Sequence, residues 1–285
     1  MIKYLIAGVV VAALVGRAGA EPDDKHLNVG VARAPAYKAP VYKAPVYKES
    51  ADGWSGFYGG LSLGARWANN DWRTSDIFPT FVGVVQTAGD HGAINSVAAR
   101  MGAYAGYNWQ FDPAWIAGIE IDFGWANNRK SASPMPGSPV VQAGLPAITA
   151  LPISSVQETW DGSVRGRVGK LITPDTLLFA TGGLAIQRVS LSASCGTFAL
   201  TPTSAPWCAV ARDETHSKTM MGWTVGGGVE RKLWGNWLAR IDYRYADFGT
   251  FNQHFFTAGA FGDDQFDAHV KVKTHTATVG IAYKF

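Results

Sequence analysis

The run THTATVGIAYKF, Thr274–Phe285, decides the fold, because two kinds of residue alternate along it. One set of alternate positions comprises Ala277, Val279, Ile281, Tyr283 and Phe285. The positions between them hold Thr276, Thr278, Gly280, Ala282 and Lys284. Side chains of a strand point alternately to its two faces, so the run predicts a strand with one apolar and one tolerant face. A soluble edge strand is usually protected by charge or proline, whereas this one stops at an aromatic residue. In a chain that starts with an export signal, such a strand indicates an outer-membrane β-barrel.

Composition agrees with many strands that pack against something apolar. The chain has 285 residues with 33 glycines, 12% aromatic and 16% charged residues. Beyond the N-terminal segment, no stretch approaches the roughly 20 apolar residues of a membrane helix. A chain this aromatic without a spanning helix is either a soluble β-protein or a barrel.

The N-terminal segment, residues 1–20, has the features of a signal peptide. Lys3 supplies the positive start, Leu5–Val15 the apolar core, and Ala18–Ala20 the small-residue cleavage site. Cleavage after Ala20 removes Lys3 and Arg17 from a formal charge of +3, which leaves about +1 (3 − 2). That charge gives no basis for nucleic-acid binding.

Residues 21–53 form a Pro/Lys-rich leader, which we expect to be periplasmic. Within it, residues 34–48 repeat a pentad, APAYK, APVYK and APVYK. Such a repeat has no apolar face and favours extended, polyproline-like conformations. The leader is either a spacer or an arm that contacts peptidoglycan.

Residues 54–285 divide into alternating segments followed by connections of regularly alternating length. Seven segments lie near residues 57–67, 97–109, 115–125, 160–168, 176–191, 218–231 and 237–245, and the eighth ends at Phe285. Turns after the second, fourth and sixth segments are short. Long connections lie near residues 69–95, 127–158, 192–216 and 250–270. Bacterial barrels have an even strand number, short periplasmic turns and long external loops. The predicted fold is therefore all-β, an eight-stranded antiparallel transmembrane β-barrel.

Tryptophans are sorted to the two ends of these segments. Trp109, Trp115, Trp234 and Trp237 flank the short turns, and the opposite ends carry Trp67, Trp125 and Trp160. Two aromatic bands separated by apolar residues match the two interfaces of a membrane.

The positions that face inward carry many charged side chains. They include Arg66, Arg100, Glu120, Asp122, Arg165, Arg167, Glu230, Arg240, Asp242 and Arg244. In the fourth segment, Asp161 and Ser163 share the inward parity. An eight-stranded barrel is only wide enough for side chains to fill, so these charges are expected to interlock as ion pairs. The alternative is an arginine-lined pore, which requires a wider lumen.

Cys195 and Cys208 are the two cysteines, and we expect them to form a disulfide in the external loop between the fifth and sixth segments. A metal or other cofactor is not expected. The six histidines lie mostly in predicted loops or the leader, without a nucleophile and an orienting acid beside them. No HExxH, P-loop or GxSxG motif occurs. We therefore expect no enzymatic activity.

Four motifs, in order, resemble the small outer-membrane β-barrels of alpha-proteobacteria, the porin-like surface antigens of Rhizobiales. They are WSGFYGG (54–60), ATGGLA (180–185), MGWTVGGGVE (221–230) and YRYADFG (243–249). The resemblance covers about residues 54–285 and implies an OmpA-related barrel in the outer membrane of a Gram-negative cell. It implies a mainly structural role, in envelope integrity and surface contact. Narrow porins and haemin-binding receptors are the alternative functions in such families.

The same resemblance implies partners. They are outer-membrane lipid and lipopolysaccharide, and the barrel-assembly machinery, which is expected to recognise Tyr283 and Phe285 on the closing strand. Covalent attachment of the leader to peptidoglycan would resemble that of some relatives only if an Ala-acidic N-terminus, Ala20-Glu21, were left by cleavage.

Overall fold

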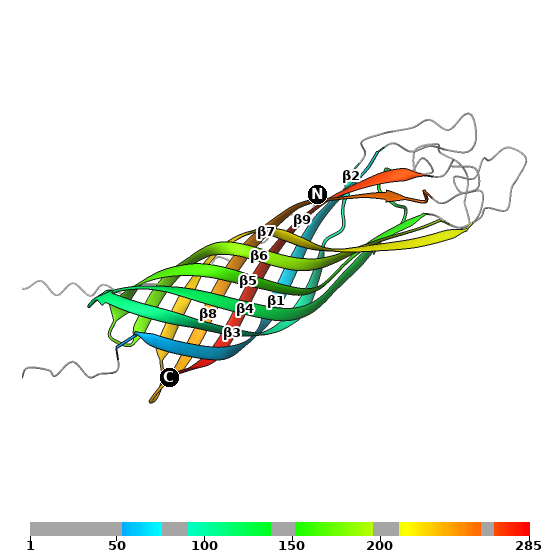
Figure 1. Ribbon diagram of the computed structural model, residues 1–285. Helices are drawn as coiled ribbons and strands as arrows, with labels where there is room; N and C mark the ends of the chain where they lie inside the picture. The colour runs from blue at the N-terminus through cyan, green and yellow to red at the C-terminus, as the bar shows by residue number, and fades with distance from the viewer. Residues whose placement is uncertain (1–52, 76–90, 138–151, 196–210, 258–264) are drawn as a thin grey trace, which may run out of the picture. The chain divides into compact units, whose positions relative to one another are not determined.

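The computed structural model describes residues 53–75, 91–137, 152–195, 211–257 and 265–285, which form one antiparallel barrel (Figure 1). The strands are β1 (Gly56–Ser75), β2 (His91–Ala93), β3 (Ser96–Asp112), β4 (Trp115–Ala132), β5 (Ile153–Thr173), β6 (Thr176–Cys195), β7 (Arg212–Lys232), β8 (Trp237–Phe255) and β9 (Phe266–Lys284). Eight long strands follow one another around the ring, and β9 pairs with β1 to close it. The predicted eight-stranded barrel is confirmed, and the short β2, which pairs with β1, was not predicted. Among the described residues, no helix is long and apolar enough to cross a membrane.

Short turns join the strands at one end of the barrel, which we call the turn end. Backbone bonds close the turn between β7 and β8, where the Trp237 N–H donates to the Trp234 carbonyl at 3.1 Å and the Leu233 N–H to the Trp237 carbonyl at 2.9 Å. Other backbone bonds tie a strand end to a neighbouring turn, as where the Leu171 N–H donates to the Ala114 carbonyl. Gly235 has a φ of 53° in the turn between β7 and β8. Glycine adopts that left-handed conformation at no steric cost, which explains its place in a turn of this tightness.

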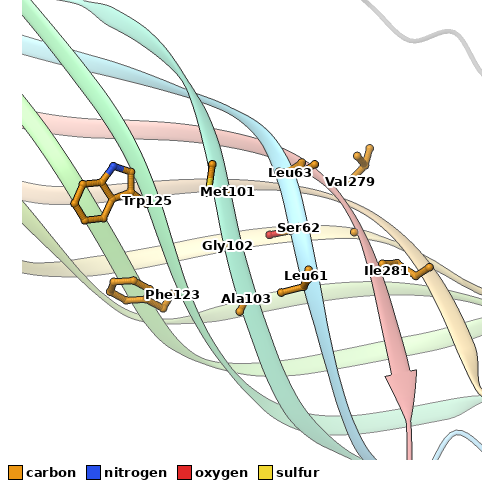
Figure 2. Close-up of a pocket in the computed structure, with 11 residues that line it drawn as sticks. Leu61, Ser62, Leu63, Met101, Gly102, Ala103, Phe123, Trp125, Val279 and Ile281 are labelled. Atoms are coloured by element: carbon orange, nitrogen blue, oxygen red, sulfur yellow. The ribbon is translucent and has the colours of Figure 1, made fainter.

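The outer wall next to the turn end is apolar. On β4, for example, the exposed residues from Trp115 to Trp125 are apolar at every outward position. About ten residues at roughly 3.4 Å each, tilted by about 40°, span a height of about 25 Å, which equals the apolar band of membrane barrels. Figure 2 shows part of this wall, where Leu61, Met101 and Ile281 border a shallow apolar hollow of about 760 Å³.

Exposed aromatic side chains border this band on both sides. The turn-end belt contains Trp109, Trp115, Trp234, Trp237, Tyr283 and Phe285. The opposite belt contains Trp67, Trp125, Trp223 and Tyr243. Their positions agree with the predicted sorting of tryptophans to two interfaces.

Beyond the second aromatic belt the strands continue, and the polarity of their two faces is reversed. On β9, Ile281 is exposed and Thr278 is buried within the band, whereas further along Lys271 is exposed and Val270 and Val272 are fully buried. β1 repeats the reversal, because Trp72 is fully buried there. The sequence segments predicted as long loops are therefore partly strand: β1 continues to Ser75 instead of ending near residue 68. Charged outward residues made these stretches resemble loops.

The reversed part of the barrel, which we call the outer part, is not a closed ring in the described residues. Pairing of β7 with β8 begins at Trp223 and Asp247, although both strands extend further. Above that point the inner faces of the two strands pack directly against each other. The ring of His216 lies 5.1 Å from that of Phe255, and the Phe256 N–H donates to the Glu214 carboxylate at 2.8 Å.

Candidate functional site: the filled barrel interior

The interior of the membrane band is filled by ion pairs, and Glu120 on β4 lies at the centre of one group. Its carboxylate lies 2.6 Å from Arg165 on β5 and 2.6 Å from Arg240 on β8. The Tyr58 hydroxyl of β1 donates to it at 2.7 Å. Arg240 also contacts Glu230 of β7 at 2.9 Å. This group therefore joins five strands across the lumen.

A second group, next to the first, contains two aspartates. Asp122 accepts from Arg100 at 2.8 Å and from Arg244 at 2.6 Å. Asp161 accepts from Arg66 at 2.8 Å and from both Arg100 and Arg244 at 2.7 Å. Every one of these side chains is at most 7% exposed, so each ion pair is shielded from solvent.

Aromatic side chains on the turn-end side of the ion pairs stack against two of the arginines. The guanidinium of Arg240 lies 4.3 Å from the ring centre of Tyr104, and that of Arg167 lies 4.4 Å from Phe179. Guanidinium groups stack favourably over aromatic faces when they are desolvated. Arg167 also lies 3.5 Å from Glu230.

All ten charged residues that the sequence places inside the barrel lie on the inner faces of their strands. They are Arg66, Arg100, Glu120, Asp122, Arg165, Arg167, Glu230, Arg240, Asp242 and Arg244. Asp242 takes a lesser part, because its described hydrogen bond comes from the Thr278 hydroxyl at 2.8 Å.

Two carboxylates of the interior are absent from the predicted set. Asp161 has the inward parity of its strand and was recognisable from alternation alone. Glu158 fell in the predicted connection near residues 127–158, whereas β5 begins at Ile153. An irregularity between Glu158 and Asp161 gives both residues the inward direction although their parities differ. Glu158 accepts from Asn70 at 2.8 Å and Gln187 at 2.6 Å.

With these two residues the interior charges balance. Among the described residues of this charged layer, six arginines (66, 100, 165, 167, 240 and 244) face six carboxylates (120, 122, 158, 161, 230 and 242). A balanced, hydrogen-bonded set avoids the large penalty of an unpaired buried charge.

A cluster of apolar residues, the floor cluster, fills the lumen at the turn end. It comprises Trp54, Tyr58, Tyr104, Ile116, Leu177, Phe179, Leu238 and Ala282. The indole N–H of Trp54 donates to the Pro174 carbonyl at 3.1 Å, and Gln110 accepts from its backbone N–H at 2.9 Å. Leu177 and Phe179 of β6 point inward in this cluster, whereas Leu178 between them is exposed.

The other end of the lumen is filled by a larger apolar cluster, the outer core. Its members include Trp72, Ile94, Met135, Val156, Val189, Leu191, Met220, Phe248, Phe251, Phe255, Phe256, Phe266, Val270 and Val272. Phe255 stacks on Phe266 with ring centres 5.1 Å apart. The interior thus holds three layers in sequence: the floor cluster, the ion pairs and the outer core.

The remaining predicted residues have mixed outcomes. Cys195 is the last residue of β6 rather than part of a loop, and it is buried and disulfide-bonded. Cys208 lies outside the described residues, so its pairing stays a prediction. His91, His216, His254 and His269 lie in strands, which corrects their predicted assignment to loops, whereas His275 lies in the closing strand as predicted. In the part of the chain that the structure describes, no group of three His, Cys, Asp or Glu residues is arranged to hold a metal ion.

Comparisons with known proteins agree with this architecture. The family model described as outer membrane protein beta-barrel domain matches residues 29–285. The 31 kDa outer-membrane immunogenic protein of Brucella melitensis biotype 1 is 32% identical over 184 residues, which are 65% of each chain. The 25 kDa outer-membrane immunogenic protein of Brucella abortus biovar 1 is 29% identical over 81% of this chain and 79% of the relative. The 22 kDa outer membrane protein of Rhizobium leguminosarum bv. viciae is 33% identical over 51% of this chain and 50% of the relative.

Proposed function

The chain belongs to the family of outer-membrane β-barrel proteins, and from that premise we propose that it is a closed, structural barrel which supports the envelope and presents surface-exposed strands and loops for contact. The observation that carries this proposal is the filled lumen, in which ion pairs lie between two apolar clusters. The turn end then faces the periplasm and the outer part faces the exterior, as in other bacterial barrels.

The three layers oppose an open channel for different physical reasons. Hydrated ions would have to pass two apolar clusters, where they lose hydration without replacement. They would also have to separate ion pairs such as Glu120 with Arg240, whose partners would remain buried and uncompensated. A narrow porin therefore requires a substantial rearrangement of this interior, and no observation favours it over the closed barrel.

We propose further that the protein is not an enzyme. Its buried carboxylates are held by arginines or amides and lie away from solvent, where no substrate reaches them. The relatives are named as outer-membrane immunogenic proteins. No observation on the described residues supports a haemin-receptor role.

The proposed periplasmic elements are the leader (residues 21–53), which remains after the signal peptide (1–20) is removed, and the rim of the closing strand. Tyr283 and Phe285 project outward from that rim with ring centres 5.3 Å apart, and the Phe285 N–H donates to the Phe57 carbonyl at 2.9 Å. This paired, aromatic edge is the surface we assign to recognition by the barrel-assembly machinery.

The leader is proposed to touch peptidoglycan through its lysines. Deleting residues 34–48 should leave barrel folding intact and reduce co-sedimentation of the protein with purified sacculi. Unchanged co-sedimentation would reduce the segment to a spacer without affecting the proposal for the barrel.

The structural role is tested in the cell. A strain of the source bacterium that lacks the gene should become more sensitive to detergent with a chelator, and the intact gene should restore resistance. A double variant, Glu120→Ala with Arg240→Ala, which disrupts the ion pairs, should restore it only partly when matched for membrane abundance. Wild-type resistance in the deletion strain would oppose a role in envelope integrity.

A further inference from the structure

The outer wall of the outer part carries a polar pocket that the structural role does not explain. It has a volume of about 590 Å³ and is formed by the neighbouring strands β1, β9 and β8. Its lining residues are Asp71, Arg73, Ser75, Thr250, Asn252, His269 and Lys271. A pocket of this size falls within the range of small-molecule sites, which makes it large enough for a sugar with a charged substituent.

Strand register brings these side chains together from three strands. Asp71 lies opposite Lys271, and Arg73 lies opposite His269 across the β1–β9 pair. On the other side of β9, Thr250 lies opposite Lys271 and Asn252 opposite His269. Paired residues share a face of the sheet, so their side chains are neighbours on the outer wall. The pocket is therefore built on paired strands.

Hydrogen bonds within the pocket link three of its lining residues. The two ring nitrogens of His269 contact the Ser75 hydroxyl at 2.9 Å and the amide oxygen of Asn252 at 2.8 Å. With its oxygen engaged, the Asn252 side chain has its NH₂ group left to donate. His269 is thereby a positioning residue that fixes Asn252.

Two cations add to these donors. Lys273, the next outward residue on β9, is paired with Asp247 at 3.7 Å. No described carboxylate forms such a pair with Arg73 or Lys271, so both cations remain available. The pocket therefore offers a guanidinium, an ammonium, an amide N–H and a hydroxyl, against the single carboxylate of Asp71.

The distance of the pocket from the membrane indicates which anionic ligand can reach it. Asp71 and Lys271 are each four positions beyond the second aromatic belt, marked by Trp67 and its partner His275. Four residues at roughly 3.3 Å each and a tilt of about 40° place the pocket about 10 Å outside the belt. The polar layer outside the hydrocarbon core is about 5–8 Å thick on each side of an ordinary bilayer, and the sugars of lipopolysaccharide extend it outward.

From this placement we propose that the pocket binds a phosphate or carboxylate group on the proximal sugars of lipopolysaccharide, with Arg73 and Lys271 contacting the anion and Asp71 accepting from a sugar hydroxyl. Arginine and lysine form charge-assisted hydrogen bonds with such oxygens. The site extends the proposed function, since it would attach the barrel to the outer leaflet, and it stands whether or not the lumen is closed.

Direct binding tests the proposal. The full-length protein in detergent micelles is titrated with deep-rough lipopolysaccharide, which carries lipid A and the inner sugars. The pocket variant is Arg73→Ala with Lys271→Ala. The matched control is Arg129→Ala with Arg188→Ala, which removes two exposed cations from β4 and β6 outside the pocket.

Affinity of the pocket variant should fall by roughly tenfold or more, because two charge-assisted contacts are lost. The control should change affinity by less than about threefold, as expected for exposed charges. Heat-modifiable migration in gels checks that each variant is folded. If the double variant misfolds, Lys271→Gln, which alters one exposed side chain, takes its place.

Two further arms identify the ligand group. Removing the anionic substituents from the same lipopolysaccharide should abolish the difference between wild type and pocket variant. Inorganic phosphate at millimolar concentration should not displace the lipopolysaccharide. Equal losses in the pocket and control variants, no loss in either, or full displacement by free phosphate would each overturn the proposal.

Discussion

Arg240 Nη2 lies 2.6 Å from Glu120 Oε2, although their strands, β8 and β4, are four places apart in the ring of eight long strands. The two residues therefore meet across the full width of the lumen. A pair on opposite walls can form only where the interior is narrow, and it leaves no open path at that height. This relationship connects the charge pattern of the sequence with the closed state of the barrel.

Replacing Glu120 with alanine should destabilise the barrel strongly. The change leaves Arg165 and Arg240 buried without their shared partner, and breaking a buried pair typically costs about 3–5 kcal/mol. Urea unfolding in lipid vesicles, followed by tryptophan fluorescence, measures this free energy. Asp213→Ala removes an exposed carboxylate on β7 and should stay within about 0.5 kcal/mol of wild type. Equal effects of both changes would mean that the interior pairs contribute little.

The membrane band is tested on its outer face. Val164, which is 60% exposed and lies opposite Ile121 near the middle of the band, should not tolerate arginine. Val164→Arg should cost about 2–4 kcal/mol in lipid. Ser192→Arg places the same side chain on the outer wall of β6 beyond the band and should be nearly neutral. A neutral Val164→Arg would show that the band is placed at the wrong height.

Because the outer core lies beyond the membrane band, we expect the outer part of the barrel to be stabilised by its own packing. Phe255 is fully buried against Phe266 and His216, so Phe255→Ala should cost about 3–5 kcal/mol of local stability. Limited proteolysis should then cut β8 and β9 in their outer part while the membrane band stays intact. His254→Ala alters an exposed residue of the same hairpin and is the control. Protease resistance of Phe255→Ala equal to that of the control would contradict a packed outer core.

Alternation in the sequence was sufficient for the membrane-crossing part of the fold. There the lipid imposes an apolar outer face and the narrow lumen a polar inner one, so one rule covers all eight strands. The inner charges of the predicted site follow from the same rule. The rule of an apolar outer face and a polar inner face fails beyond the second aromatic belt, because water replaces lipid outside the barrel there. In that part β1 buries Trp72 and exposes Asp71 and Arg73.

Strand irregularities account for the other differences between the predicted and the observed facing of residues. The register shift between Glu158 and Asp161 in β5, and that between Asp247 and Thr250 in β8, change which parity faces inward. Gly249, with a φ of 74°, marks the second of these in the sequence. Nothing in the local sequence marks the first, and Glu158 lay in the predicted connection near residues 127–158, so it was not assigned to the interior. The pocket beside Lys271 depends on the register of three strands and could not be predicted either.

Deletion of Phe285 tests the edge that we assign to assembly. Loss of this residue removes the backbone bond to Phe57 and one ring of the aromatic pair with Tyr283. The amount of assembled protein in the outer membrane should fall several-fold, with degraded material in the periplasm. Phe111→Ala, an exposed aromatic at the same end of the barrel, is the control. Unchanged heat-modifiable migration and abundance of the shortened protein would contradict the assignment.

Single-channel recording in planar bilayers tests the closed lumen most directly. Pure, folded protein should give no stable conductance steps in molar salt, since Glu120 and Arg240 bridge the lumen between two apolar clusters. An open porin inserted under the same conditions establishes the sensitivity of the recording. Reproducible steps of constant size from the wild-type protein would contradict a closed lumen.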